Sequence, residues 1–374
     1  MSGWLGVLVF VAALLVVILI HESGHFFVAR AFRIKVEEFF VGFGPRLWSV
    51  RRGETEYGLK ALPFGGYVRI AGMNPFQEVA PEDLPRSYGA KPVWQRALVI
   101  AAGPVTHFLM AVAFLALFFA AIGVYDPSRP LVEQVEPTLG GRVSPAAAAG
   151  LRPGDEVVAV DGRPVRSIDA LVAYTRQRVG RPLTLTVRRD GEELTLRATP
   201  VLSEVGGERV GRLGVVLGAA RERLDPVLAL GRAAVRTGLL IKGIVLQLED
   251  VFGPRGLARI GELLTQGGAR RPTDPTGIVG GARLASEAVR AGAWDYLFEL
   301  LVVFNVFIGV INLVPLPPLD GGHLAVLAYE KLARRRPDLR KLVPISALVT
   351  AYLVVLALSV TYIDIVAPLP NPFQ

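Results

Sequence analysis

The segment His21-Glu22-Ser23-Gly24-His25 places two imidazoles and a carboxylate at the end of one of the most apolar stretches of the chain. Residues four apart share a face of an α-helix, so both imidazoles can reach one metal ion, as in the H-E-x-x-H pattern. Glu22 projects beside them, where it can hold a metal-bound water and accept its proton. The segment therefore predicts a hydrolytic zinc site. The alternative is a polar cap that merely ends an apolar helix.

Zinc in a catalytic site takes three protein ligands and leaves the fourth tetrahedral position open. The candidates for the third ligand, in or beside apolar runs, are His107, Glu299, Asp320, His323 and Asp364. The first and third apolar runs cross in the same direction, so Asp320, after the third run, reaches the depth of His25. Glu299 and Asp364 fall at the opposite face. We therefore predict Asp320 as the third ligand.

The two remaining histidines have open roles. We expect His107 to bond a neighbouring helix, with a contact to substrate or to a metal ligand as the alternative. We expect His323 to be a loop residue, with a hydrogen bond to a metal ligand as the alternative.

The chain of 374 residues is 52% apolar, with a mean hydropathy of +0.44. Four uncharged runs are near or above the ~20 residues that a helix needs to cross a bilayer. These runs are Met1–Ile20, Ala97–Tyr125, Leu300–Leu319 and Leu342–Ile363. The first run lacks a basic leader, which favours a retained helix over a cleaved signal peptide. We predict a polytopic α-helical membrane protein.

The net charge of +8 is unevenly distributed. Arginine and lysine concentrate between the first and second runs and between the third and fourth, which marks both loops as cytoplasmic. The charge is therefore no sign of nucleic-acid binding, and the long segment after the second run lies outside the cell. The chain has no cysteine, which excludes disulfides and cysteine-rich zinc sites.

The segments between the runs predict distinct elements. Thr55–Met73 alternates in character around Gly-Gly and predicts a hairpin or curled sheet, and Val41–Trp48 is apolar enough to dip into the bilayer. Pro127 opens an α/β domain whose last strand is Arg209–Leu217. Leu228–Gln247 predicts a basic amphipathic helix on the membrane surface, or else a soluble helix packed on the exported domain. Gln266–Gly277 predicts a polar linker.

The expected division of the chain has eight parts. They are a first transmembrane helix with HExxH (1–30), a cytoplasmic-side loop with a membrane-associated, reentrant β element (31–96), a second transmembrane helix (97–125), an extracytoplasmic α/β domain (126–220), an amphipathic helix and linker (221–295), a third transmembrane helix with LDGG (296–322), a basic cytoplasmic loop (323–341) and a fourth transmembrane helix (342–367).

These motifs together resemble the site-2 protease family of intramembrane zinc metalloproteases, in its bacterial regulator of sigma-E protease branch. The resemblance covers nearly the whole chain. It rests on HESGH at 21–25, GFGP at 42–45, FGGYVRIAGM at 64–73, AAGPVTH at 101–107, a PDZ-like stretch at about 128–217, and NLVPLPPLDGG at 312–322.

The resemblance implies that His21, His25 and Asp320 bind one zinc ion and that Glu22 is the general base. It implies that Asn312 holds the unwound substrate backbone. It also implies that a β element pairs with the extended substrate, a mode in which backbone bonds give affinity. The implied substrate-binding residues of this element are Phe64, Gly65, Gly66, Tyr67, Val68, Arg69 and Ile70.

The chain departs from the family pattern in two places. Position 107 is histidine where the family commonly has asparagine, which leaves the role of that asparagine in doubt. One PDZ-like module replaces the two tandem modules of the best-known members, so gating by a tandem is not implied. Whether the single module binds a peptide or filters substrates by size stays open.

The leading hypothesis is an intramembrane zinc endopeptidase of the bacterial inner membrane, with its site near the cytoplasmic face. Its substrates would be single-pass membrane proteins, such as trimmed anti-sigma factors or remnant signal peptides. Its partners would be substrate, the lipid bilayer and a peptide or protein at the PDZ-like domain, with no nucleic acid. The alternative is a PDZ-containing membrane scaffold with an inactive metal site. A transporter is disfavoured, because the chain lacks internal repeats.

Overall fold

The computed structural model describes residues 3–74, 76–205, 208–271 and 273–373, without the side chains of Pro63, Phe64 and Leu339. The chain forms two compact units. One consists of Met1–Leu115 with Leu230–Gln374, and the other of Ala116–Ala229.

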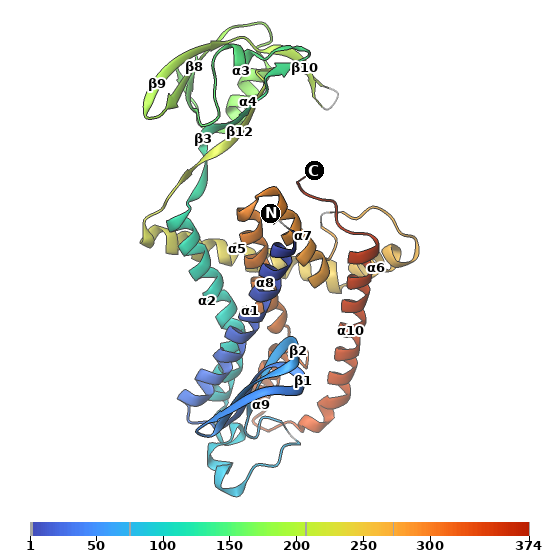
Figure 1. The fold of residues 1–374 in the computed structure, drawn as a ribbon. Coiled ribbons are helices and arrows are strands. Elements are labelled where there is room, and N and C mark those ends of the chain that lie inside the picture. Colours follow the sequence, from blue (N-terminus) through green and yellow to red (C-terminus); the bar gives the residue numbers. More distant parts are fainter. Residues whose placement is uncertain (1–2, 75, 206–207, 272, 374) are drawn as a thin grey trace. The chain divides into compact units, whose positions relative to one another are not determined.

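The first unit is built from helices and two strands, and two of its helices continue into the second unit (Figure 1). The helices are α1 (Gly3–Ala31), α2 (Val93–Ala121), α5 (Pro226–Phe252), α6 (Pro254–Thr265), α7 (Ile278–Ala291), α8 (Trp294–Asn312), α9 (Asp320–Ala333) and α10 (Val343–Val366), with 3-10 turns at Pro81–Arg86, Tyr88–Ala90 and Leu339–Leu342.

Four helical segments are long and apolar enough to cross a membrane: Gly3–Ala31, Val93–Ala121, Trp294–Asn312 and Arg340–Val366. At a rise of ~1.5 Å per residue, α1 alone exceeds the ~30 Å hydrocarbon core. Leu109 of α2 and Leu358 of α10 are about two-thirds exposed, as side chains in contact with lipid are. The four predicted apolar helices are therefore present.

Helix α1 crosses its neighbours closely because glycines lie at the crossings. A Cβ on Gly6 would sit 2.3 Å from the carbonyl oxygen of Ala285 in α7, and one on Gly24 would sit 2.7 Å from that of Ala102 in α2. Below the second crossing, apolar side chains of α1, α2, α9 and the β element form one buried cluster. These contacts give the H-E-x-x-H segment a rigid setting.

The third apolar helix ends earlier than the predicted boundary of 322. Helix α8 stops at Asn312, because the three prolines at positions 315, 317 and 318 cannot continue it. Asp320 therefore does not end this helix but opens the next one, α9. The expected basic loop at 323–341 is also corrected, since α9 continues to Ala333 before the 3-10 turn at Leu339–Leu342.

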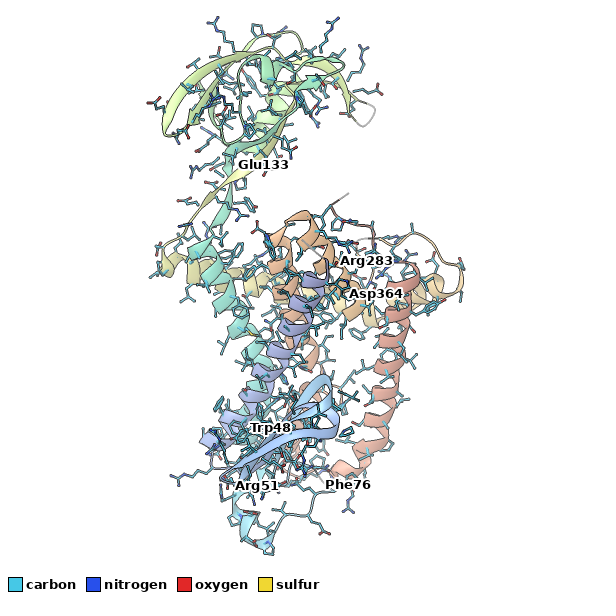
Figure 2. The ribbon with its side chains drawn as sticks, in the orientation of Figure 1. Trp48, Arg51, Phe76, Glu133, Arg283 and Asp364 are labelled. Atoms are coloured by element: carbon cyan, nitrogen blue, oxygen red, sulfur yellow. The ribbon has the colours of Figure 1, made fainter. Side chains whose placement is uncertain are left out.

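The segment expected to be one amphipathic helix and a linker holds three helices. Helix α5 begins at Pro226, and α6 and α7 flank the predicted linker. Asp364, at the end of α10 (Figure 2), is hydrogen-bonded to the linker and to the first turn of α7. Its carboxylate accepts hydrogen bonds from Arg270 (2.8 Å), from Thr276 (3.1 Å) and from the amides of Gly277 and Gly280 (both 2.9 Å). The polar linker is thereby docked on the end of α10.

The β element consists of the antiparallel strands β1 (Val36–Arg52) and β2 (Thr55–Ile70). Strand β2 folds back along β1, so its two halves lie on opposite sides of the start of β1. Phe39 of β1 therefore pairs with Tyr57 on one side and with Val68 on the other. Residues 66–70 pair with β1 on one side, and no strand among the described residues pairs with their other edge. The segment Thr55–Met73, expected to form a hairpin or curled sheet by itself, instead supplies one strand, β2, which pairs with β1. Trp48 (labelled in Figure 2) pairs with Leu59 in this sheet, and its side chain is 61% exposed.

The second unit is a sheet with two helices on it. Its strand order is β12-β3-β6-β8-β9, with β7 on β6 and two separate hairpins, β4-β5 and β10-β11. The elements are β3 (Val124–Val135), β4 (Thr138–Leu139), β5 (Arg142–Val143), α3 (Pro145–Ala148), β6 (Glu156–Val160), β7 (Arg163–Pro164), α4 (Ile168–Arg176), β8 (Leu183–Arg189), β9 (Glu192–Ala198), β10 (Val201–Val205), β11 (Glu208–Arg212) and β12 (Val215–Glu222).

The predicted last strand of this unit is in fact two strands. Gly214, with a φ of +79°, breaks it between β11 and β12. A buried ion pair helps to hold the sheet, with the guanidinium of Arg189 on both carboxylate oxygens of Asp155 at 2.7 and 2.8 Å. Burial opposes ionisation of Asp155. The hydrogen bonds from Arg189 and from the Arg152 amide outweigh it and hold the pKa of the carboxyl below its ordinary value.

Candidate metal centre

Helix α1 presents both histidines of the H-E-x-x-H segment on one face. Their Nε2 atoms lie 3.2 Å apart. Helix α2 passes directly over them at Gly103, where a Cβ would sit 2.3 Å from Nε2 of His25 and 2.7 Å from Cε1 of His21. Only glycine leaves room for the two imidazoles at this crossing.

Asp320 completes a triangle with the two imidazoles. Its Oδ2 lies 3.3 Å from Nε2 of His21 and 3.4 Å from Nε2 of His25. The turn before it folds back tightly on the end of α8. A Cβ on Gly321 would sit 2.3 Å from the carbonyl oxygens of Leu313 and Val314. The glycines of LDGG are therefore needed to bring the carboxylate to α1.

The dimensions of this triangle fit a tetrahedral zinc ion. Two nitrogen or oxygen ligands of such an ion, each ~2.0–2.1 Å from it, lie ~3.3–3.4 Å apart. The three observed separations are 3.2, 3.3 and 3.4 Å. Oδ2 of Asp320 is buried and has no hydrogen-bond partner among the described residues. A buried oxygen without a donor needs a cation or a proton to compensate it.

The hydrogen-bond partners of His25 set which of its nitrogens carries the proton. Its Nδ1 lies 2.8 Å from the carbonyl oxygen of Val99, which can only accept. Nδ1 therefore carries the proton and donates it. In the neutral ring this leaves the Nε2 lone pair free to face Asp320 and a metal ion.

The same reasoning shows which nitrogen of His21 carries the proton, through the hydrogen bonds of two further residues, Asn305 and His107. The Nδ2 of Asn305 donates to the His107 carbonyl at 2.8 Å, so its Oδ1 faces Nδ1 of His107, also at 2.8 Å. His107 is therefore protonated at Nδ1 and accepts at Nε2. Nδ1 of His21, 3.0 Å away, donates to it. The relay Asn305–His107–His21 thus leaves the Nε2 lone pair of His21 free for the metal.

Glu22 lies in one pocket with His21, His25 and Asp320. The pocket has a volume of about 200 Å³. Its lining residues are His21, Glu22, His25, Tyr67, Val68, Ile70, Met73, Pro318, Asp320 and His323. Val68, on the unpaired edge of β2, lines the same pocket as Glu22. The acid–base candidate and an open strand edge therefore face each other across the pocket.

The residues predicted for substrate binding do not all lie at the pocket. Tyr67, Val68 and Ile70 line the pocket, and a Cβ on Gly66 would lie 3.3 Å from Cγ of Glu22. Arg69 instead pairs with Glu38 at 3.0 Å.

Gly65 packs against Phe43, whose ring a Cβ there would meet at 2.5 Å. The side chain of Phe64 lies outside the described residues. Asn312 ends α8 and is not among the described residues that line the pocket.

Four other residues belong to the surroundings of the site. His323 is not a loop residue but lies in the first turn of α9 and lines the pocket. His107 serves both roles weighed for it, since it bonds α8 and also His21. Asn305 was missed, although a polar residue within an apolar helix is a signal of function. The carbonyl of Val99 carried no sequence signal at all.

A two-histidine, one-carboxylate site beside a glutamate, within helices long enough to span a bilayer, is typical of membrane-embedded metallopeptidases. The pattern of Peptidase family M50 matches residues 9–357 of the chain. The chain therefore belongs to peptidase family M50, the site-2 proteases, as its sequence motifs predict. It is a membrane peptidase.

Similar proteins match along nearly the full length. Zinc metalloprotease Rip1 of Mycolicibacterium smegmatis is 34% identical over 99% of this chain and 98% of its own. Zinc metalloprotease Rip1 of Mycobacterium tuberculosis has the same identity and coverage. Metalloprotease MmpA of Caulobacter vibrioides is 33% identical over 90% of this chain and 89% of its own.

Proposed function

We propose that this chain is a zinc endopeptidase in which His21, His25 and Asp320 bind one zinc ion and Glu22 is the general base. The observation that carries the proposal is the triangle of Nε2, Nε2 and Oδ2 at 3.2–3.4 Å, in which the hydrogen bonds at both Nδ1 atoms leave the Nε2 lone pairs free. The relatives named zinc metalloproteases support the choice of metal.

Bound zinc would polarise the scissile carbonyl and make water acidic enough to lose a proton near neutral pH. The residues of the chain would do the rest. Glu22 accepts the proton of the attacking water and passes it to the leaving amine. The relay through His107 holds the His21 ring.

The substrate is a single-pass membrane protein that is unwound at the site. A helical segment hides its peptide bonds, so cleavage needs an extended backbone. The unpaired edge of residues 66–70 offers strand pairing within reach of Glu22. Trimmed anti-sigma factors and remnant signal peptides fit this requirement, and Asn312 would hold the unwound chain where α8 ends.

The distribution of charge supports the orientation. The loops that contain β1, β2 and α9 are rich in arginine and lysine, so they lie on the cytoplasmic side of a bacterial inner membrane. The metal site then lies near the cytoplasmic face, and the second unit lies outside the cell.

The second unit would be a PDZ-like domain that contacts a peptide or filters substrates by size. Strand β12 is an edge strand of its sheet. A groove of about 330 Å³ runs between β12 and α4, lined by Leu171, Val172, Val215 and Leu217. An extended peptide could pair with β12 and insert an apolar side chain there.

Cleavage of a model transmembrane substrate in liposomes tests the proposed roles. Glu22→Gln should keep about one zinc per chain and lose at least ~100-fold in rate, within the range of general base catalysis. His21→Ala should lose both zinc and activity. Zinc binding with equal turnover in both wild type and Glu22→Gln would reject the assignment. Zinc content without any cleavage by wild type would favour the scaffold alternative.

A further inference from the structure

We propose that the cleft between the first turn of α2 and the last turn of α9 binds the headgroup of an anionic phospholipid. The cleft has a volume of about 510 Å³. Its lining residues are Val93, Glu330, Lys331, Arg334, Arg335 and Arg336. None of them belongs to the metal site.

The single acidic residue of the cleft is already neutralised. Arg96 donates two hydrogen bonds to the Glu330 carboxylate, at 2.9 and 2.7 Å, and both side chains are nearly buried (7% and 11% exposed). The hydrogen bonds from Arg96 hold the pKa of Glu330 below its ordinary value, so this carboxylate stays ionised. The four basic side chains of the cleft therefore face solvent without a second acidic residue in its lining.

Two of these four cations are held in place by neighbours. Arg335 donates to the Tyr329 hydroxyl at 2.8 and 3.1 Å. Arg336 donates to the carbonyl of Gly89 at 2.9 Å and lies 3.3 Å from Glu330. These contacts fix the direction of both guanidinium groups. A guanidinium that is already oriented binds phosphate with less loss of entropy.

The other two cations have no such neighbours. No hydrogen bond or ion pair joins Lys331 or Arg334 to another residue in the described part of the chain. The first turn of α2 also carries no acidic residue, and the partial positive charge of its N-terminus offsets the partial negative charge at the C-terminal end of α9. The cleft therefore carries a local excess of positive charge, which attracts an anion.

The neighbouring apolar residues indicate that the anion belongs to a lipid. Trp94, next to Val93, is 57% exposed, and Leu332, next to Lys331, is 85% exposed. Helix α2 enters the apolar span at this turn, which places the cleft at headgroup depth. Basic pockets between membrane helices at the cytoplasmic side bind anionic headgroups. A free phosphate would gain nothing from the exposed apolar side chains.

Lipid binding by the full-length, detergent-purified protein tests the proposal without any proteolysis, so its outcome is independent of the proposed function. The probes are phosphatidylglycerol, phosphatidylcholine and inorganic phosphate, titrated against intrinsic tryptophan fluorescence and counted by native mass spectrometry. We expect at least tenfold tighter binding of phosphatidylglycerol than of phosphatidylcholine. Inorganic phosphate should not displace the lipid at equal concentration.

A triple variant, Lys331→Gln with Arg334→Gln and Arg335→Gln, should lose this preference by at least tenfold. The matched control changes three exposed basic residues elsewhere in the first unit: Arg33→Gln, Arg51→Gln and Arg52→Gln. It removes the same charge and should change binding by less than threefold. If the triple variant unfolds, Lys331→Gln with Arg334→Gln replaces it, since neither side chain has a described partner to lose.

Three outcomes would overturn the proposal. Equal losses in the triple variant and its control would show a diffuse charge effect without a site. Equal affinity for the two lipids would exclude recognition of the headgroup charge. Displacement by inorganic phosphate would assign the cleft to a soluble anion.

Discussion

Replacing Asn305 by leucine should weaken zinc binding although Asn305 does not touch the metal. The change keeps the number and branching of the heavy atoms in this side chain of α8 and removes the oxygen that fixes His107. His107 can then carry its proton on Nε2, which turns that atom from an acceptor into a donor toward Nδ1 of His21. His21 would have to keep its proton on Nε2, where the metal binds.

The size of this effect follows from the contacts that are lost. Two buried hydrogen bonds disappear, one at Oδ1 and one at Nδ2 of Asn305, both 2.8 Å long. A buried hydrogen bond contributes about 1 kcal/mol, and loss of an outer partner of a metal ligand costs about 10–100-fold in metal affinity. We therefore expect a zinc dissociation constant about 10–100-fold higher.

Competition with a fluorescent zinc chelator measures this constant on the purified full-length protein. Thr350→Val in α10 is the control, because it also removes an intramembrane polar group, one whose hydroxyl donates to the Ser346 carbonyl of its own helix. It should leave zinc affinity unchanged. A dissociation constant for Asn305→Leu within twofold of wild type, in a folded protein, would refute the relay.

Three further predictions concern packing and charge. Gly103→Ala should abolish zinc binding, because its Cβ would overlap the His25 ring. The control Gly238→Ala, in α5, has open space around it and should leave the zinc content unchanged. Metal analysis of both purified proteins tests this prediction. Asp364→Leu leaves the buried Arg270 without its carboxylate partner, which costs about 3–5 kcal/mol. Limited proteolysis should then cut the chain near residues 266–277. Resistance to proteolysis like that of wild type would contradict the docking role of Asp364. Asp155→Asn should destabilise the second unit by about 1–3 kcal/mol at pH 7, as measured by amide hydrogen exchange of β6 and β8. The pKa of Asp155 in the folded protein lies below its ordinary value of 3.8. Wild type therefore keeps the stability from this ion pair above about pH 4 and loses it as the pH falls further. A difference in stability between the two proteins that persists at lower pH would contradict the ion pair as its cause.

The sequence by itself determined the parts of the protein that depend on local spacing. The four apolar runs predict the four candidate membrane helices, since a helix that crosses the hydrocarbon core of a bilayer needs an uninterrupted length of apolar residues. His21 and His25 share a face because they are one helical turn apart. Asp320 was predicted from topology, because two runs that cross in the same direction end at the same depth.

The tertiary structure decided what depends on residues far apart in the chain. The end of α8 at Asn312 and the start of α9 at Asp320 needed the coordinates, because prolines predict a break but not where the chain resumes a helix. The unpaired edge of β2 depends on which strands pair. The protonation of the two metal-facing imidazoles depends on Val99, His107 and Asn305, which lie on other helices. A hydrogen bond between helices has no sequence spacing, so only packing could bring these partners together.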